Sequence, residues 1–250
     1  DVCKNQKEED YLILNYDDEL TRAMAKDKRV KARVVFFSRL HNLEEGICLQ
    51  DDAIVIRENG TETKVIDTKD LILLGGHNLE NYMAGIGVAH YMGIPMEIIV
   101  SAVKTFKGVA HRIEFVKEVN GVAYYNDSKG TNPDAAIKGI QAMNRKTVLI
   151  GGGYDKGVAF DDWIKAFDGK VKKLVLLGQT AHMIADTAAK YGFTEVAFAE
   201  DLKQAVELCF EAAEPGDAVL LSPACASWGM FDNYEQRGDM FKEFVNELGA

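Results

Sequence analysis

The sequence predicts an α/β protein whose second part forms a Rossmann-like, doubly wound, mostly parallel sheet. Three observations support this prediction. From about residue 108 onward, short apolar runs alternate with helical patterns. These runs are apolar throughout, which is typical of strands buried on both faces of a parallel sheet. Asn120-Gly121 separates two such runs and indicates a tight hairpin, so one edge of the sheet is expected to be antiparallel.

The composition is that of a globular protein with room for two ordinary domains. The chain has 250 residues, of which 47% are hydrophobic and 27% charged. Its net charge of −10 argues against nucleic acid as a main partner, because phosphate binding needs a basic face. No apolar run reaches the roughly 18 residues of a membrane span, and no signal peptide is recognisable. We expect a cytoplasmic protein that does not bind membranes.

The four cysteines show no metal-binding or disulfide spacing. They stand at Cys3, Cys48, Cys209 and Cys225, without a CxxC pair. Reduced thiols in a cytosolic protein are the expected state.

The first part, residues 1–107, is predicted to mix parallel strands with a meander. Asn59-Gly60 between apolar runs is a strong hairpin signal. The apolar patterns place strands at 11–15, 34–38, 46–50, 53–57 and 63–66, and helices at 17–25, 77–92 and 95–106.

The second part, residues 108–250, is predicted to be one compact domain. The boundary is expected near Lys107-Gly108. The patterns place strands at 113–119, 122–126, 147–150, 174–177, 196–199 and 218–222, and helices at 132–143, 161–168, 180–190, 201–213 and 234–248.

Polar or glycine-rich clusters stand at four places where strands of this domain begin or end. Ligands of open α/β sheets bind outside the carboxyl ends of the strands, so clusters far apart in sequence are expected to share one site. The clusters are His111-Arg112, NDSKGTN at 126–132, GGGYDKG at 151–157 and SPACAS at 222–227.

The chemistry of these clusters suits an anionic ligand. Lys129, close to a helix start, would stabilise an anion, and Asp127 could accept hydrogen bonds from ribose hydroxyls. Lys156 is a natural partner for a carboxylate, and the planar fork of Arg112 fits phosphate or carboxylate. The alternatives are a capped helix start, a glycine-rich turn with an exposed lysine, a surface arginine, and a packed crossover without a ligand.

Taken together, these motifs resemble the Mur ligase family, and specifically its D-glutamate-adding members. The resemblance rests on SPACAS followed by F-x-N-x-EQRG, on NDSKGTN and on GGGYDKG, and it extends in order over essentially the whole chain. Gly130 replaces a common alanine, and Tyr234 stands where phenylalanine is frequent. The D-N-P-R and H-N-P elements of other family branches are absent from the sequence.

The resemblance implies two domain assignments. Residues 1–107 would be the later part of the central, ATP-binding domain, and residues 108–250 the C-terminal, amino-acid-binding domain. No G-x-x-x-x-G-K-[ST] loop occurs in the sequence. We therefore expect that loop, the metal ligands and the UDP-sugar domain to precede Asp1, and the chain alone to be inactive.

The resemblance also implies a reaction and the residues that serve it. ATP, with Mg²⁺, would phosphorylate UDP-N-acetylmuramoyl-L-alanine, and D-glutamate would attack the resulting acyl phosphate. Lys129 would stabilise charge near the transferred phosphoryl group. Nucleotide contacts would come from Asn78, Asn81, Arg112 and Asp127, although Asn78 and Asn81 could equally be a helix cap and a surface residue. D-glutamate contacts would come from Thr131, Asp155, Lys156, Ser227 and Tyr234, and no metal ligand is expected in the chain.

Two functions from other classes remain open. An NAD-type oxidoreductase would suit a Rossmann-like fold, but GGGYDKG does not have the G-x-G-x-x-G spacing. A non-catalytic module that binds nucleotide or amino acid is the other. The partners are expected to be small molecules and the protein a monomer, with the oligomeric state left open.

Overall fold

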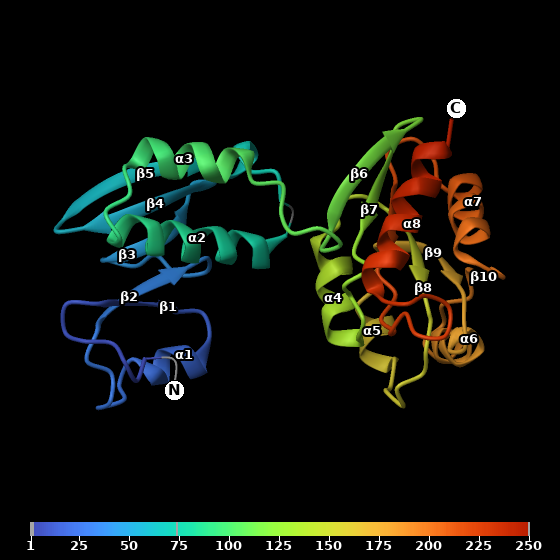
Figure 1. The fold of residues 1–250 in the computed structure, drawn as a ribbon, viewed down its shortest axis with the longest axis horizontal. Helices are drawn as coiled ribbons and strands as arrows, with labels where there is room; N and C mark the ends of the chain where they lie inside the picture. The colour runs from blue at the N-terminus through green and yellow to red at the C-terminus, as the bar shows by residue number, and fades with distance from the viewer. Residues whose placement is uncertain (1–2, 74, 250) are drawn as a thin grey trace. The chain divides into compact units, whose positions relative to one another are not determined.

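The computed structural model describes residues 3–73 and 75–249, which form two compact units (Figure 1). Unit 1 comprises residues 1–107 and unit 2 residues 108–250. Each has its own sheet and its own hydrophobic core. Within the described ranges, no helix has both the length and the apolar character needed to cross a membrane.

Unit 1 is built on a five-stranded sheet in the order β1-β2-β3-β4-β5. The first three strands are parallel and the last three form the predicted antiparallel meander. The strands are β1 (Tyr11–Asn15), β2 (Arg33–Ser38), β3 (Gly46–Gln50), β4 (Ala53–Glu58) and β5 (Thr61–Asp67). The helices are α1 (Glu19–Met24), the 3₁₀ turn η1 (Thr68–Asp70), α2 (Gly76–Tyr91) and α3 (Met96–Thr105).

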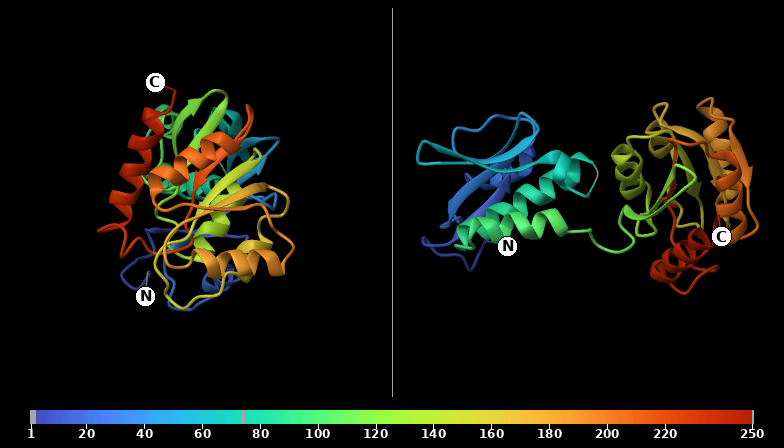
Figure 2. Two further views of the ribbon diagram at one scale, coloured as in Figure 1. Left: turned by 90° about the vertical axis from the view of Figure 1, so that its right-hand side faces the viewer. Right: turned by 90° about the horizontal axis from the view of Figure 1, so that it is seen from above.

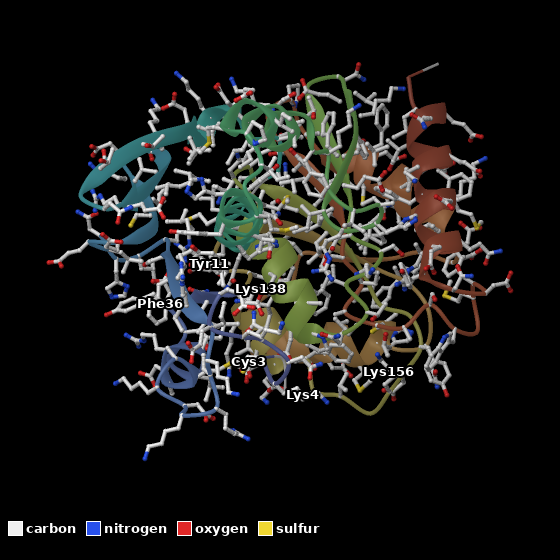
Figure 3. All side chains as sticks on the ribbon, turned by 60° about the vertical axis from the view of Figure 1, so that its left-hand side comes forward. Cys3, Lys4, Tyr11, Phe36, Lys138 and Lys156 are labelled. Atoms are coloured by element: carbon white, nitrogen blue, oxygen red, sulfur yellow. The ribbon has the colours of Figure 1, made fainter. Side chains whose placement is uncertain are left out.

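Both faces of this sheet carry apolar side chains. The larger cluster packs α2 and α3 against the strands and includes Ile47, Ile54 and Ile86. A smaller cluster on the other face gathers around Leu12 and Leu14, with Cys3 and Phe36 packed against it (Figure 3). The alternation of buried and half-buried residues along β1 follows from the two-residue period of a strand.

Unit 2 is a six-stranded sheet in the order β10-β9-β8-β11-β7-β6. All neighbours are parallel except β6 and β7, which the Asn120-Gly121 turn joins as predicted. Both turn residues have positive φ (51° and 79°), as a primed hairpin turn requires. The strands are β6 (Glu114–Val119), β7 (Val122–Asn126), β8 (Thr147–Gly151), β9 (Val171–Leu176), β10 (Val196–Phe198) and β11 (Ala218–Leu221).

Helices cover both faces of the second sheet (Figures 1 and 2). One core packs α4 (Pro133–Ala142), α5 (Asp161–Lys165) and α6 (Ala181–Lys190) on one face. The other core packs α7 (Leu202–Ala212) and α8 (Tyr234–Glu247) on the opposite face. The predicted doubly wound, mostly parallel α/β fold is confirmed.

Two predicted boundaries in unit 2 are wrong. The helix expected over 161–168 ends at Lys165, and Asp168 and Gly169 turn left-handed (φ 39° and 67°) beyond it. Strand β9 begins at Val171 rather than at 174. The charged Lys172 and Lys173 interrupt the apolar pattern at the start of this strand. In the fold, Lys172 forms an ion pair with Asp217 at 2.7 Å.

A candidate ligand site at the carboxyl edge of the second sheet

Three neighbouring strands deliver the predicted polar clusters to one edge of the sheet. β8, β11 and β7 lie side by side and run parallel. The loops that follow them therefore leave from the same edge. The fourth cluster joins them, because the Lys129 amide donates to the His111 carbonyl oxygen at 3.0 Å. The structure thus brings together residues from four distant stretches of sequence.

The loops are cross-linked by hydrogen bonds. The Tyr154 amide donates to the Ala226 carbonyl at 2.9 Å, which joins the loops after β8 and β11. The Lys156 ammonium donates to the Thr131 carbonyl at 2.8 Å, which joins the loops after β8 and β7. Lys156 is labelled in Figure 3 and is exposed, so its ammonium is open to a ligand from solvent.

The glycines after β8 allow this loop to press against its neighbours. Gly152 has φ of 99°, and a Cβ there would lie 2.2 Å from the Leu177 carbonyl oxygen. Gly153 has φ of 147°, and its Cβ would lie 2.5 Å from the Ala226 oxygen. Side chains are excluded at both positions. The Asp155 carboxylate, further along, accepts the Gly157 amide at 2.7 Å and so closes the turn on itself.

Asp127 is buried and faces inward. Its Oδ2 accepts from the Ser222 hydroxyl at 2.7 Å, and its Oδ1 accepts from the Ile113 amide at 3.3 Å. Burial raises the pKa of this carboxyl to about 7, against the smaller lowering effect of these hydrogen bonds. Gly130 and Gly139 leave it space, since a Cβ at either would lie within 3 Å of Oδ2. Its role toward a ribose stays a prediction.

Lys129 and Tyr234 lie together at the edge. The Lys129 ammonium stands 5.5 Å from the centre of the Tyr234 ring, a cation–π contact. The same ring meets His111 edge-on at 6.0 Å. The Tyr234 carbonyl accepts from the Ser128 hydroxyl at 2.7 Å, so the start of α8 is tied to the loop after β7.

The loop after β11 carries Ser227 at the carboxyl edge of the sheet. Ala224 adopts φ of 57°, an uncommon conformation for a residue with a side chain, and it is fully buried. Ser227 is also buried, and its carbonyl accepts the Met230 and Phe231 amides. Its hydroxyl forms no hydrogen bond within the part of the chain that the structure describes. Such a hydroxyl can form a hydrogen bond with a ligand.

The remaining predicted residues are Arg112 in unit 2 and Asn78 and Asn81 in unit 1. Arg112 is exposed beside His111. In unit 1, Asn78 is buried and Asn81 exposed on the same face of α2, and the Asn81 amide donates to the Asn78 oxygen at 3.3 Å. Their contact with adenine stays a prediction.

Three buried polar residues lie within the predicted motifs, but the sequence assigned no role to them. Arg237 is 2% exposed and donates three hydrogen bonds into the loops. His111 and Asn126 form a buried pair, with 3.1 Å between Nδ1 and Nδ2. Only the EQRG motif pointed to Arg237, because burial of an arginine leaves no periodic signal. A Cβ on Gly238 would lie 2.2 Å from the His111 Nδ1, so this glycine is required for close packing.

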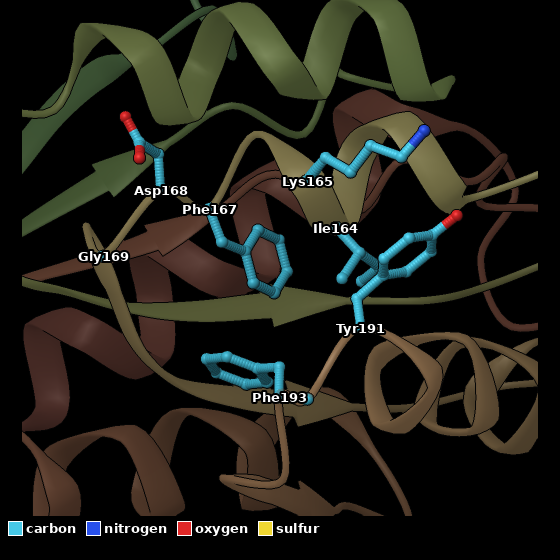
Figure 4. A pocket seen from close by; sticks show the side chains of 8 residues that line it. Ile164, Lys165, Phe167, Asp168, Gly169, Tyr191 and Phe193 are labelled. Carbon is cyan, nitrogen blue, oxygen red and sulfur yellow. The ribbon is translucent and has the colours of Figure 1, made fainter.

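A separate hollow lies away from this edge. Its volume is about 340 Å³, and its lining residues precede β9 and β10 at the amino edge of the sheet (Figure 4). Phe167 and Phe193 are among its lining residues, with ring centres 5.1 Å apart. It contains none of the predicted site residues. Residues 3–73 and 75–249 hold no cluster of three or more His, Cys, Asp or Glu that could bind a metal.

Chemically, the carboxyl edge suits a small anion. It offers two accessible ammonium groups, from Lys129 and Lys156, an uncommitted hydroxyl from Ser227, and a buried guanidinium from Arg237 beneath them. Groups of this kind can hold and orient a ligand by charge and hydrogen bonds.

Comparison with known proteins identifies related sequences. Residues 111–225 match the family model described as Mur ligase, glutamate ligase domain. The chain is 53% identical over 249 residues to a protein of Thermoanaerobacter sp. (strain X514) named UDP-N-acetylmuramoylalanine--D-glutamate ligase. It is 50% identical over 247 residues to a protein of the same name from Lachnoclostridium phytofermentans. Both alignments cover 99% of this chain and 54% of the relative, so the chain spans about half the length of the curated relatives it matches.

Solved structures share the fold. A UDP-N-acetylmuramoylalanyl-D-glutamyl-2,6-diaminopimelate--D-alanyl-D-alanyl ligase from Acinetobacter baumannii aligns with a TM-score of 0.65 at 14% identity, covering 95% of this chain and 51% of that one. MurF ligase from Thermotoga maritima, solved with ADP, aligns with a TM-score of 0.59 at 16% identity, covering 98% and 56%. At these identities the likeness establishes the fold alone.

Proposed function

Because this chain belongs to the Mur ligase family, we propose that it provides the amino-acid-binding domain and the later part of the ATP-binding domain of a D-glutamate ligase. The observation that carries the proposal is the convergence of Lys129, Lys156 and Ser227 at one sheet edge. The names of the relatives at 50–53% identity support D-glutamate as the amino acid.

The proposed reaction joins D-glutamate to UDP-N-acetylmuramoyl-L-alanine. ATP transfers its γ-phosphoryl group to the alanyl carboxylate and leaves as ADP. The D-glutamate amine forms a C–N bond to the acyl carbon, the C–O bond to phosphate breaks, and the amine loses a proton. Because the nucleophile belongs to the substrate, no covalent protein intermediate is expected. Positioning and charge stabilisation are the contributions left to the protein.

In this scheme the edge residues divide between the two reacting partners. The Lys129 ammonium stabilises negative charge near the transferred phosphoryl group. Lys156 and Ser227 bind the D-glutamate carboxylates, and the exchange of the Thr131 carbonyl for a carboxylate would give Lys156 a stronger, charge-assisted bond. Asp155 and Tyr234 complete the pocket wall.

Nucleotide contacts are proposed for each unit separately. Asn78 and Asn81 sit three residues apart on α2, and a pair of amides offers the donors and acceptors that an adenine edge needs. Arg112 and Asp127 are assigned to the nucleotide from unit 2. Mg²⁺ would accompany the phosphates, but no group of side chains among the described residues fits it. No step is therefore assigned to a protein-bound metal.

The test is phosphate release by this chain joined to the N-terminal portion of the Thermoanaerobacter relative. The chain covers 54% of that relative, and we propose that the N-terminal portion supplies the P-loop that the sequence lacks. With ATP, Mg²⁺ and UDP-N-acetylmuramoyl-L-alanine, release should require D-glutamate and should not occur with a diamino acid. The intact relative serves as the positive control, and thermal unfolding shows whether the joined protein folds.

Other outcomes would replace the proposal. Release with a diamino acid would change the substrate. No release from a folded joined protein, together with D-glutamate binding by calorimetry, would favour a non-catalytic binding module. Quenching of tryptophan fluorescence by NADH would favour an oxidoreductase. We expect the 250-residue chain alone to bind D-glutamate weakly and to show no turnover.

We further infer a cytoplasmic monomer, since all proposed substrates are small polar molecules. Sedimentation velocity of the joined protein with and without ligands tests the monomer, and fractionation of cells tests the location.

A further inference from the structure

Arg237 is the most deeply buried charged side chain near the carboxyl edge. It lies in the first turn of α8 and is 2% exposed. Burial lowers the pKa of its guanidinium to about 10, so the group stays charged at neutral pH. Among the residues that the structure describes, no carboxylate lies within ion-pair distance of it. A buried charge without an ionic partner is costly unless hydrogen bonds satisfy it.

Its hydrogen bonds run to two of the site loops. Nε donates to the Ser128 hydroxyl at 2.9 Å, and one Nη donates to the Ser128 carbonyl at 2.8 Å. The other Nη donates to the Cys225 carbonyl at 3.2 Å. The guanidinium thus bridges the loop after β7, which carries Lys129, and the loop after β11, which carries Ser227.

The third loop also lies over this side chain. An ideal Cβ on Gly153 would stand 3.5 Å from Nη1 of Arg237, so the glycine backbone after β8 packs directly against the guanidinium. The bridge continues outward, because the Ser128 hydroxyl that accepts from Arg237 donates to the Tyr234 carbonyl. All the loops assigned to the amino acid therefore converge on one side chain.

We propose that Arg237 is a positioning residue for D-glutamate, which holds the three edge loops in their binding arrangement and sets a positive charge beneath them. The Asp127 carboxyl interacts with it electrostatically but forms no ion pair with it, so the guanidinium still favours an anion bound above it in a poorly hydrated place. Its rigid planar fork donates from three separate nitrogens to three acceptors in fixed directions, whereas a lysine has all its donors on one nitrogen at the end of a flexible stem. The assignment to D-glutamate rests on the proposed function.

The first experiment needs only this chain. Amide hydrogen exchange is compared among the unaltered protein, Arg237→Lys, Ser128→Ala and Lys172→Met. Lys172 is the control, because it makes an ion pair at the opposite edge of the same sheet. Arg237→Lys and Ser128→Ala should each speed amide exchange in residues 152–156 and 224–227 about tenfold, because the loss of one hydrogen bond of about 1.4 kcal/mol changes the opening equilibrium by that factor. Exchange in α7 should stay unchanged. Ser128→Ala keeps the test decisive if Arg237→Lys does not fold.

The second experiment separates positioning from simple structural support. In the joined protein described above, Arg237→Lys should raise the KM for D-glutamate about tenfold or more, while the KM for ATP changes less than about twofold. Lys172→Met should leave both unchanged. Faster exchange without a change in the KM for D-glutamate would make Arg237 merely structural and overturn the inference, as would unchanged exchange. An unaltered joined protein that is folded but inactive would refute the proposed ligase. In that case calorimetry compares the D-glutamate affinity of this chain with that of its Arg237→Lys variant. Weaker binding by the variant supports the inference, and equal binding overturns it.

Discussion

Replacing Asp127 by asparagine should change how the stability of unit 2 depends on pH. The carboxyl is buried against Ser222 and the Ile113 amide, and burial raises its pKa from 3.8 to about 7. Between about pH 4 and pH 7 the folded state therefore binds a proton at this group that the unfolded state has released. The stabilisation is complete below pH 4 and is lost as the pH rises through 7.

The expected size follows from this pKa difference. Each pH unit between the two pKa values changes the unfolding free energy by about 1.4 kcal/mol. Going from pH 5 to pH 8 should therefore destabilise the unaltered chain by roughly 2 to 3 kcal/mol through Asp127 alone. An asparagine has nearly the same shape, can accept from Ile113 and donate to Ser222, and does not titrate. Asp127→Asn should lack this loss, so its stability relative to the unaltered chain should rise by that amount over the same interval.

Urea unfolding followed by tryptophan fluorescence measures this difference. Both tryptophans of the sequence, Trp163 and Trp228, lie in unit 2, so the signal reports that unit alone. Asp134→Asn, at an exposed acid in α4, is the matched control and should leave the pH dependence as it is. Parallel stability curves for Asp127→Asn and the unaltered chain would show that the carboxyl ionises normally, and the reasoning from burial would be wrong.

Four further predictions concern two glycines, Lys156 and the two tryptophans. Gly238→Ala should lower the unfolding free energy of unit 2 by roughly 1 to 3 kcal/mol in urea titrations, because the new Cβ would collide with His111. Gly85 in α2 has open space around it, so Gly85→Ala should stabilise unit 1 by up to about 1 kcal/mol, as measured by calorimetry. Lys156→Ala should raise the KM of the joined protein for D-glutamate about tenfold or more with unfolding unchanged; an unaltered KM would remove Lys156 from the site. Iodide should quench only part of the tryptophan fluorescence, because Trp228 is 57% exposed and Trp163 fully buried, and complete quenching would contradict that burial.

The local patterns predicted most elements because each has a period or turn signal of its own. The alternation of apolar strands and helices in residues 108–250 gave the doubly wound sheet, which the structure confirms, and Asn120-Gly121 gave its antiparallel edge. Where a strand began with lysines, at 172 and 173, this pattern failed. Their charges are accommodated by contacts distant in sequence, such as the pairing of Lys172 with Asp217.

The exposed or buried state of the site residues could not be read in the same way. Trp228 is 57% exposed and meets the exposed Tyr154 edge-on at 5.6 Å. The Asp127 carboxyl accepts a hydrogen bond from Ser222, almost a hundred positions along the chain. Neither orientation is fixed by neighbouring residues.

The sequence by itself determined the fold class, the clusters that carry charge and glycine, and the resemblance to the Mur ligases, because these depend on local periodicity and on motifs. Only the tertiary structure decided which groups meet. It seated Arg237 under three loops, turned Asp127 into the interior and shifted its pKa, and left the Ser227 hydroxyl uncommitted among the described residues. Burial and pairing depend on strand order, and the insertion of β11 between β7 and β8 is what brings these distant residues to one edge.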